Sequence, residues 1–402
     1  MKSLTPEVSV NRWLTLGLIA VLAGATVPAR AQTSATVVEI AASLHVLVLL
    51  SDGSVVALGE NRSGQLGRPQ GIRRFFPAGR VPLPAKALHV AAGEDTSFAL
   101  LDDGSVWAWG RGVNGTLGVD LKGATERYTP QAIPKLQGVS QIVADGNTAM
   151  AVMADGTVRA WGALPEFLTR GRAAERVPQP VPLPGLENIA RVTGEPSMGF
   201  ALTKDGRVMG WGRNSGGLLG IGRMTPEPQP PTELAALKDV VSIAAVAGAT
   251  AAVTRDGRVW TWGSNGQAGL GDGERADTSD PARTTPQPVK GISDAIEVKA
   301  GSYGRHLIVR RRNGTLIGWG NSDWGQLGAG ISGDFQPTPK PINLPGVEAY
   351  WLGGNFSFAR TKEGAMWFWG EQSAAQGLLG LRANQRVPAK VPTEKLLPQQ
   401  ER

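Results

Sequence analysis

Short apolar runs alternate with polar residue pairs along most of the chain. In the first repeat, apolar runs at 46–50 and 55–58 flank the pair Asp52-Gly53. Two apolar runs around Asp-Gly predict a β-hairpin, which we expect to be closed by a type I′ turn with φ > 0 at both central residues. Because the runs are almost continuously apolar and do not alternate, both faces of these strands should be covered.

The hairpin pattern occurs seven times, and each turn pair is followed six residues later by an aromatic residue or leucine and then glycine. The turn pairs are Asp52-Gly53, Asp103-Gly104, Asp155-Gly156, Asp205-Gly206, Asp256-Gly257, Asn313-Gly314 and Glu363-Gly364. The answering pairs are Leu58-Gly59, Trp109-Gly110, Trp161-Gly162, Trp211-Gly212, Trp262-Gly263, Trp319-Gly320 and Trp369-Gly370. Successive turn pairs are 51, 52, 50, 51, 57 and 50 residues apart, so the chain is a repeat protein.

Each repeat contains two further segments besides the hairpin. Proline-rich links such as 178–184 suit outer edge strands, because proline cannot donate to a sheet ladder. A third apolar run, such as 87–93, follows each link. Four short strands per repeat predict an all-β fold, a seven-bladed β-propeller with four antiparallel strands per blade, over the single domain 32–402.

Closure of the ring needs a strand that the first repeat lacks, since no proline-rich segment precedes Val37. The last proline-containing segment, 386–392, has nothing after it to complete a blade. We therefore expect the C-terminal residues to supply the missing strand of the first blade. Deleting residues 383–402 should then lower the melting temperature sharply.

The repeat Asp-Gly-x-Val-x-x-Trp-Gly-x-Asn-x-x-Gly-Gln-Leu-Gly resembles that of the regulator of chromosome condensation family. The match covers residues 37–392, and the third repeat departs most because residues 163–167 follow Trp161-Gly162 without a Gln-Leu-Gly ending. The resemblance implies a seven-bladed propeller. It also suggests two activities that occur in the family. One is nucleotide exchange on a Ran-type GTPase, although no GTPase-contacting wedge is matched in this sequence. The other is inhibition of β-lactamases, which exported members of the family carry out.

Residues 1–31 have the features of a secretory signal peptide. Lys2 and Arg12 charge its front, residues 14–27 are apolar, and Ala29-Arg30-Ala31 forms a small-x-small cleavage site before Gln32. We expect an exported, periplasmic or extracellular protein, with a retained N-terminal membrane anchor as the alternative. No later stretch is long and apolar enough to cross a membrane.

The composition excludes several kinds of chemistry and bears on one class of partner: cysteine-dependent sites are ruled out, and nucleic acid is not expected as a partner. The chain has no cysteine, which excludes disulfides, iron–sulfur ligation and thiol catalysis. Its formal charge of +7 is mildly basic for 402 residues. A nucleic-acid partner would call for a dense basic stripe, whereas the one basic run is 310–312, so we expect no nucleic-acid partner.

No catalytic, cofactor or metal site is predicted. His45 and His306 share one repeat position, which favours a structural role, and no zinc or phosphate-loop motif is present. The aspartates of the turn pairs should bond local backbone. The acidic segment 272–280 lies in the one long insertion, where a solvated loop and a Ca²⁺ site are the alternatives.

The tryptophans of the Trp-Gly pairs are interpreted as structural packing residues. They are Trp109, Trp161, Trp211, Trp262, Trp319 and Trp369. Replacing Trp211 or Trp262 by alanine should lower stability without selectively removing a binding activity.

Partner-binding residues are sought where the repeat is broken. Arg73-Arg74-Phe75-Phe76 combines arginines and aromatics as interface hot spots do, although the phenylalanines could instead cover a blade edge. Trp324 replaces an ordinary loop residue. With Tyr303, Tyr350 and Trp351 it could form an exposed aromatic patch, or these rings could be buried.

The sequence thus favours an exported, non-enzymatic, monomeric propeller that binds a protein partner through its face loops. Alternatives are a cell-wall or carbohydrate-binding propeller, an inhibitor of a secreted enzyme, and an enzyme such as a hydrolase or lyase.

Overall fold

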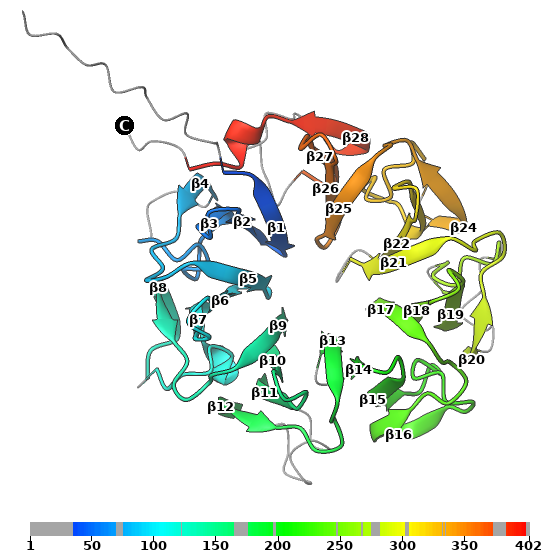
Figure 1. Cartoon of the computed structure of the whole chain (residues 1–402), viewed down its shortest axis with the longest axis horizontal. Helices are drawn as coiled ribbons and strands as arrows, with labels where there is room; N and C mark the ends of the chain where they lie inside the picture. Colours follow the sequence, from blue (N-terminus) through cyan, green and yellow to red (C-terminus); the bar gives the residue numbers. More distant parts are fainter. Residues whose placement is uncertain are drawn as a thin grey trace, which may run out of the picture. The chain divides into compact units, whose positions relative to one another are not determined.

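The computed structural model describes residues 35–69, 75–121, 123–164, 176–195, 198–246, 248–266, 268–274, 282–301, 305–331, 333, 335–372 and 383–398. Within them, 28 strands form seven four-stranded antiparallel sheets. The sheets are arranged as blades around a central axis (Figure 1), so the predicted seven-bladed β-propeller is confirmed.

Each blade is one continuous stretch of chain whose strands run in order from the innermost to the outermost. Blades 1 to 3 consist of β1 (Val37–Ala42), β2 (His45–Leu50), β3 (Val55–Glu60), β4 (Phe75–Arg80); β5 (Ala87–Ala92), β6 (Thr96–Leu101), β7 (Val106–Arg111), β8 (Glu126–Ala132); and β9 (Val139–Asp145), β10 (Thr148–Met153), β11 (Val158–Ala163), β12 (Arg176–Pro182). Blades 4 and 5 consist of β13 (Ile189–Glu195), β14 (Met198–Thr203), β15 (Val208–Asn214), β16 (Thr225–Glu233); and β17 (Val240–Val246), β18 (Ala249–Thr254), β19 (Val259–Gly263), β20 (Arg283–Pro288). Blades 6 and 7 consist of β21 (Ala295–Ala300), β22 (His306–Arg311), β23 (Leu316–Asn321), β24 (Phe335–Ile342); and β25 (Val347–Leu352), β26 (Phe356–Thr361), β27 (Met366–Gly370), β28 (Gln385–Val391). Two short 3₁₀ turns, η1 (Val113–Gly115) and η2 (Thr393–Lys395), complete the secondary structure of the described residues.

The middle strands of the blades form the core. Every residue of β2 and β3 is buried, which confirms that these apolar runs are covered on both faces. The proline-rich segments lie outermost: β16 carries four prolines, and all of its side chains are exposed or half-buried. Proline is tolerated there because an outermost strand needs only half of its backbone groups for pairing.

The hairpin turns differ from the expected type I′ geometry. Gly53 has a φ of 82°, but Asp52 is not among the residues with positive φ. The N–H of Gly53 donates to the carbonyl oxygen of Leu50 at 2.9 Å, which closes a turn at Ser51-Asp52 and leaves the glycine as a left-handed residue after it. This is the three-residue hairpin loop, whose twist also suits the strands. The Asp52 carboxylate accepts from the Ser54 N–H at 2.9 Å, as predicted for the turn aspartates.

The expected closure of the first blade by the C-terminal strand is wrong. Blade 1 already has four strands, since the segment after its hairpin forms β4, and β28 pairs with β27 as the outermost strand of blade 7. The repeat begins with the innermost strand and ends with the outermost, so no strand has to be exchanged between the two ends. The C-terminal residues still contact the first blade, because Leu396 is fully buried in a cluster with Val37 and Leu58.

Tryptophan joins neighbouring blades. All six tryptophans of the Trp-Gly pairs are completely buried. The indole N–H donates to a backbone carbonyl of the preceding blade in the pairs Trp109 to Gln65 at 2.9 Å, Trp161 to Thr116 at 2.8 Å, Trp262 to Leu218 at 2.7 Å, Trp319 to Gly269 at 2.9 Å and Trp369 to Gln326 at 2.8 Å. A buried donor without such an acceptor would be costly, so each indole fixes the distance between two blades.

The Leu-Gly ending of the repeat follows from the same contact. Gly220 has a φ of +67°, and a Cβ there would lie 2.8 Å from Nε1 of Trp262. Any larger residue would be strained in the left-handed region and would also push the indole away.

The interface between blades 7 and 1 is built differently, because Leu58 occupies the tryptophan position. Phe356, Phe358 and Phe368 of blade 7 fill the space, with ring centroids 5.2 to 5.9 Å apart. This irregularity of the repeat is therefore a change of packing at the point where the ring closes.

Candidate functional site

The structure separates the predicted partner-binding residues. Arg73 and Arg74 lie outside the described residues. Phe75 and Phe76 are half-buried at the start of β4, and Phe76 packs against the core cluster between blades 1 and 2 with the Arg68 guanidinium 6.0 Å from its ring centre. Phe76 thus covers a blade edge, which was the alternative to a role in a partner interface.

Trp324 is 43% exposed in the loop after β23 of blade 6, so blade 7 stands between it and the phenylalanines of blade 1. Tyr350 is completely buried and Trp351 is 9% exposed, so neither joins Trp324 in an exposed patch. Tyr303 lies outside the described residues. The structure therefore assembles no aromatic patch from Trp324, Tyr350 and Trp351.

The ring has two faces, which we name from the connections they carry. The turn face holds the hairpin turns between the second and third strands and the links from each blade to the next. The loop face holds the connections between the first and second strands and between the third and fourth strands. A central cavity of about 440 Å³ is lined by the innermost strands of the blades.

The third residue of each innermost strand faces the next blade near this cavity. These residues are Glu39, His89, Gln141, Arg191, Ser242, Glu297 and Ala349. Several of them bond the unpaired backbone of the neighbouring innermost strand. Gln141 accepts from the N–H of Val192 at 3.0 Å and donates to its carbonyl at 3.3 Å, and Ser242 bonds both groups of Val298 at 3.1 Å. Side chains here satisfy the edge that every innermost strand would otherwise leave open.

Glu39 and His89, two of these third-position residues, form an ion pair. Nδ1 of His89 lies 2.7 Å from Oε1 of Glu39, and its Nε2 lies 3.0 Å from the carbonyl oxygen of Ile142. Burial lowers the pKa of His89, but the hydrogen bond and negative charge of Glu39 outweigh it, so the pKa is raised. The pair therefore joins blades 1, 2 and 3.

Lys299 is a half-buried cation in the wall of the central cavity. Its Nζ donates to the carbonyl oxygen of Tyr350 at 2.7 Å, lies 4.7 Å from the centre of the Tyr350 ring, and is 3.3 Å from Oε1 of Glu297. Burial lowers the pKa of Lys299, and Glu297 opposes that shift. Its charge is thus engaged within the ring.

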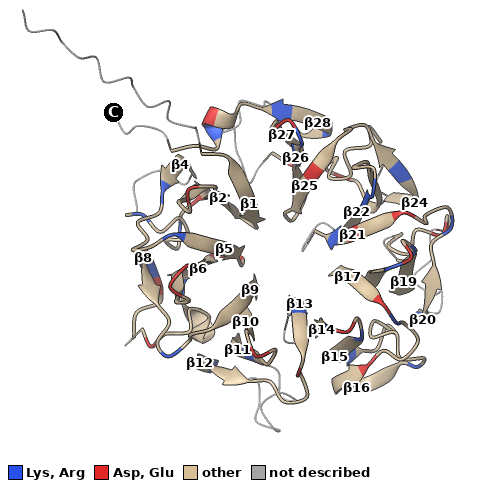
Figure 2. Ribbon diagram, viewed as in Figure 1, with Lys and Arg blue, Asp and Glu red and all other residues tan. Residues whose placement is uncertain are grey.

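A second cavity, which we call the turn-face cleft, lies on the turn face across blades 4, 5 and 6 and has a volume of about 400 Å³. Its cations are Arg191, Lys204, Arg255 and Arg310. Glu297 is the one carboxylate among its described lining residues, which also include Val241 and Ile296. Figure 2 shows Lys and Arg on β13 and β21, which border this part of the ring.

The cations of the cleft differ in their partners. Arg310 lies 3.2 Å from Glu297, and Arg255 lies 3.9 Å from Asp239. Arg191 and Lys204 are exposed and form no ion pair with the residues that the structure describes. Two cations of the cleft are thus available to an anionic group from outside.

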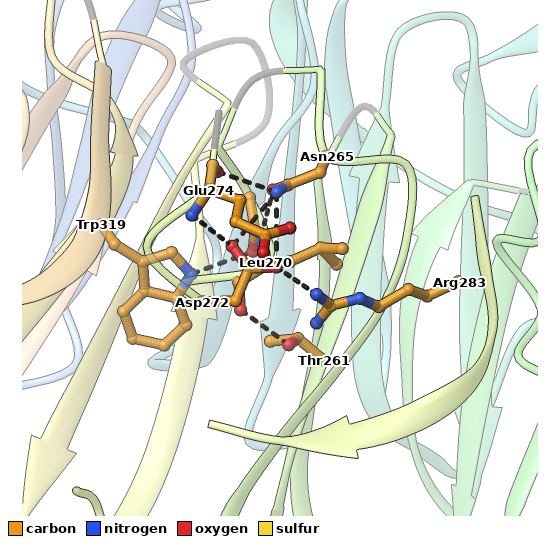
Figure 3. Close-up of polar contacts among 8 residues, drawn as sticks. Thr261, Asn265, Leu270, Asp272, Glu274, Arg283 and Trp319 are labelled. Carbon is orange, nitrogen blue, oxygen red and sulfur yellow. Dashed lines mark hydrogen bonds and ion pairs between the residues drawn. The ribbon is translucent and has the colours of Figure 1, made fainter. Parts of the chain in front are cut away.

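The loop after β19 carries the insertion that makes the fifth spacing longer. Figure 3 shows Asp272 held by the Arg283 guanidinium, while Asn265 donates to Asp272 at 3.1 Å and to the carbonyl oxygen of Glu274 at 2.9 Å. A cleft of about 1110 Å³ lies beside these residues, between β20 and β24. Within 35–398, wherever residues are described, no three His, Cys, Asp or Glu side chains are grouped to hold a metal ion.

The two equivalent histidines are buried. His45 and His306 are both completely buried and each faces the glycine of its Leu-Gly or Trp-Gly pair, which confirms that they share one repeat position. Nε2 of His45 lies 2.6 Å from Oγ of Ser97 in blade 2. Burial lowers the pKa of His45 to about 3. Among the described helices, none could span a membrane.

The turn-face cleft was not predicted from the sequence, because each repeat was considered by itself and equivalent positions of different repeats were not compared. The signal is visible when one position is compared in all blades. The residue before each turn pair is Ser51, Asp102 and Ala154 in blades 1 to 3, and Lys204, Arg255, Arg312 and Lys362 in blades 4 to 7. The basic run 310–312 is one part of that column.

Comparisons with known proteins agree with the fold. The family model described as the RCC1-like domain matches residues 11–350. The ultraviolet-B receptor UVR8 of Arabidopsis thaliana is 31% identical over 364 residues, which cover 87% of this chain and 68% of the receptor. The E3 ubiquitin-protein ligase HERC2 of Mus musculus is 29% identical over 336 residues, or 79% of this chain.

This chain spans only 6% of the length of HERC2. Among solved structures, yeast RCC1 (Prp20) bound to Kap60 superposes with a TM-score of 0.73 at 21% identity, covering 88% of this chain and 85% of that chain. The family model covers most of the seven repeats, and the described residues form the seven-bladed propeller that those repeats predict. The chain therefore belongs to the RCC1-like domain family.

Proposed function

We propose that this chain is an exported, non-enzymatic β-propeller that binds a protein partner on its turn face. The observation that carries the proposal is the turn-face cleft, in which Arg191 and Lys204 are exposed without an ion pair among the described residues. Charged groups that a fold does not use for itself are the groups most available for steering and fixing a partner.

Two further features support binding without catalysis. The carboxylates of the hairpin turns are engaged by their own turns, as Asp205 is by Thr203 and Arg207. Their pKa values are lowered by these hydrogen bonds, which suits structural anions better than general acids. The solved yeast propeller Prp20 is seen bound to Kap60, and the use of such a ring as a binding surface is proposed here for this chain.

A pair of photo-crosslinking variants tests the face. A benzophenone amino acid replaces Val241, which is 38% exposed beside the cleft, or Met224, which is 52% exposed on the loop face. Residues 32–402 of each variant are irradiated in envelope extract of the source cell. We expect a protein adduct from position 241 that unlabelled wild-type chain competes away, and none from position 224.

Adducts from position 224 alone would place the partner on the loop face, and no adduct from either position would contradict a protein partner. Retention on immobilised peptidoglycan, with no protein adduct, would favour the cell-wall alternative instead.

Export is tested separately. Residues 1–31 are fused to an alkaline phosphatase that folds only outside the cytoplasm. Activity of the fusion, and a mature N-terminus at Gln32, are expected. An inactive fusion would contradict export, and an active fusion that stays in the membrane with residues 1–31 attached would show an anchor.

A further inference from the structure

We propose that the turn-face cleft recognises an acidic segment of a protein, in which two or more carboxylates flank an apolar side chain. This inference rests on the proposed function and names the chemistry of the bound segment. It is carried by three features of the cleft: a free arginine, a surplus of cations, and apolar groups between them.

The free arginine stands out when blades 3 and 4 are compared. Gln141 and Arg191 occupy the same position of their innermost strands. Gln141 is bonded to both backbone groups of Val192 in the next blade. Arg191 forms neither a hydrogen bond nor an ion pair among the described residues, although a guanidinium has five donors to offer. The fold leaves these donors to solvent or to a ligand.

The charges around the cleft leave a positive surplus. Glu297 is shared by Arg310 at 3.2 Å and Lys299 at 3.3 Å, so its negative charge is already outnumbered. Asp239 lies 3.9 Å from Arg255, and both side chains are more than two-thirds exposed. Lys204 and Arg191 add two more positive charges and form no ion pair among the described residues, although the charge of Lys204 helps to lower the pKa of Asp155. An anion entering the cleft therefore meets uncompensated cations on the blade 4 side.

The apolar groups lie between these charges. Val241 is the extra residue of a β-bulge at the start of β17, which turns its side chain outward and leaves it 38% exposed. Ile296 occupies the same bulge in blade 6 and is half-buried. An apolar side chain of the partner can cover both residues while its neighbouring carboxylates reach the cations.

The same surroundings disfavour a polyanion. No aromatic side chain lines the cleft among the described residues, so a single-stranded nucleic acid would find no stacking platform, nor a sugar an aromatic one. Carboxylates also follow two of the cations in the sequence, because Asp205, which comes after Lys204, pairs with Arg207, and Asp256, which comes after Arg255, pairs with Arg258. A long chain of phosphates would run onto these negative charges, whereas a short acidic segment would not.

The test measures fluorescence anisotropy with residues 32–402 and a fluorescein-labelled decapeptide in which glutamates alternate with leucines. The variant R191A/K204A removes the two free cations. The control variant K390A removes an exposed lysine on the outermost strand of blade 7. A decapeptide with glutamine in place of glutamate and a labelled oligothymidylate of equal charge are the comparison probes.

We expect the acidic peptide to bind, R191A/K204A to weaken binding about tenfold, and K390A to leave it unchanged. Raising the salt concentration from 50 to 300 mM should weaken the binding further, since exposed ion pairs are screened. Melting curves of the variants should coincide with that of the wild type.

Equal binding of the glutamine peptide, equal loss in K390A, or tighter binding of the oligothymidylate would overturn the inference. Its failure is separable from failure of the proposed function. A protein adduct at position 241 without acidic-peptide binding would reject the acidic segment alone, while peptide binding without any adduct in cell extract would reject the proposed protein partner.

Discussion

The blade 3–blade 4 interface and the blade 4–blade 5 interface present the same inner-strand position in two ways. In the first, Gln141 bonds the N–H and the carbonyl of Val192 in the next blade. In the second, Arg191 forms no such bond among the described residues and is exposed at the turn-face cleft. The two residues occupy equivalent positions in successive repeats, so the two interfaces differ in the side chain and not in the backbone.

The comparison teaches that a repeat can release a position for binding because a buried tryptophan, present at both interfaces, keeps the blades together. Between blades 4 and 5, the indole of Trp262 donates to Leu218 at 2.7 Å, and its ring meets Phe200 edge-on at 6.0 Å. A buried aromatic pair of this kind stabilises by more than the area it covers. Arg191 is therefore not needed to hold this interface.

The largest expected effect comes from removing that aromatic contact. Trp262→Ala should lower the free energy of unfolding by about 3–5 kcal/mol, because it leaves a cavity and removes the indole hydrogen bond to the Leu218 carbonyl. Urea unfolding measures it. Binding per folded molecule should be unchanged, because Trp262 joins the blades and does not contact the partner. Lost binding with an unchanged free energy of unfolding would contradict this separation of structural and partner-binding residues.

A smaller loss is expected at the blade 3–blade 4 interface. Gln141→Ala leaves two backbone groups of Val192 without their side-chain partner and should lower the free energy of unfolding by about 2 kcal/mol. Hydrogen exchange at the Val192 amide should accelerate. Unchanged exchange there would show that the glutamine contact does not protect the strand edge.

A histidine of the blade 1–blade 2 interface makes stability depend on pH. Burial lowers the pKa of His45 to about 3, so the unfolded chain binds a proton at a pH where the folded chain does not. The contribution of His45 should therefore be complete above about pH 7 and should fall by about 1 kcal/mol between pH 7 and pH 5.5. Threonine stands at the same position in blade 2, as Thr96, so His45→Thr is the matched variant. An equally steep decline in that variant would exclude His45 as the cause.

The smallest effect is expected at the ion pair between Glu39 and His89. In Glu39→Gln the burial of His89 remains but the neighbouring negative charge is gone, so the pKa of His89 should fall below that of an exposed histidine. In the wild type this raised pKa stabilises the fold at low pH, and that contribution is lost as pH rises through it. The chain has three histidines, so NMR titration can follow each. A pKa unchanged in the variant would mean that Glu39 does not set it.

The architecture could be predicted from the sequence because the residue pattern of each local structure occurs seven times. Asp-Gly pairs give hairpins, Trp-Gly pairs give buried aromatic contacts, and proline-rich links give outermost strands. The closure was mispredicted because each proline-rich segment was assigned to the blade that follows it, whereas it is the last strand of the blade that precedes it. In the structure the repeat begins at β1, so β28 completes its own blade.

The candidate site was less accessible to prediction. Aromatic irregularities such as Phe76 and Tyr350 drew attention, yet a ring side chain that breaks a repeat can be buried as easily as exposed. Arg191 and Lys204 look ordinary within their own repeats. Only the arrangement of the blades brings residues of three repeats to one cleft, and no local pattern encodes that meeting.

The most direct test measures Gln141→Ala and Arg191→Ala side by side, each for urea unfolding and for binding of the acidic decapeptide. The account predicts a crossover. Gln141→Ala loses about 2 kcal/mol of unfolding free energy and keeps its binding, whereas Arg191→Ala stays within about 0.5 kcal/mol of the wild type and binds more weakly. If Arg191→Ala proves as destabilising as Gln141→Ala and binds the peptide as the wild type does, Arg191 is a structural residue and the account is contradicted.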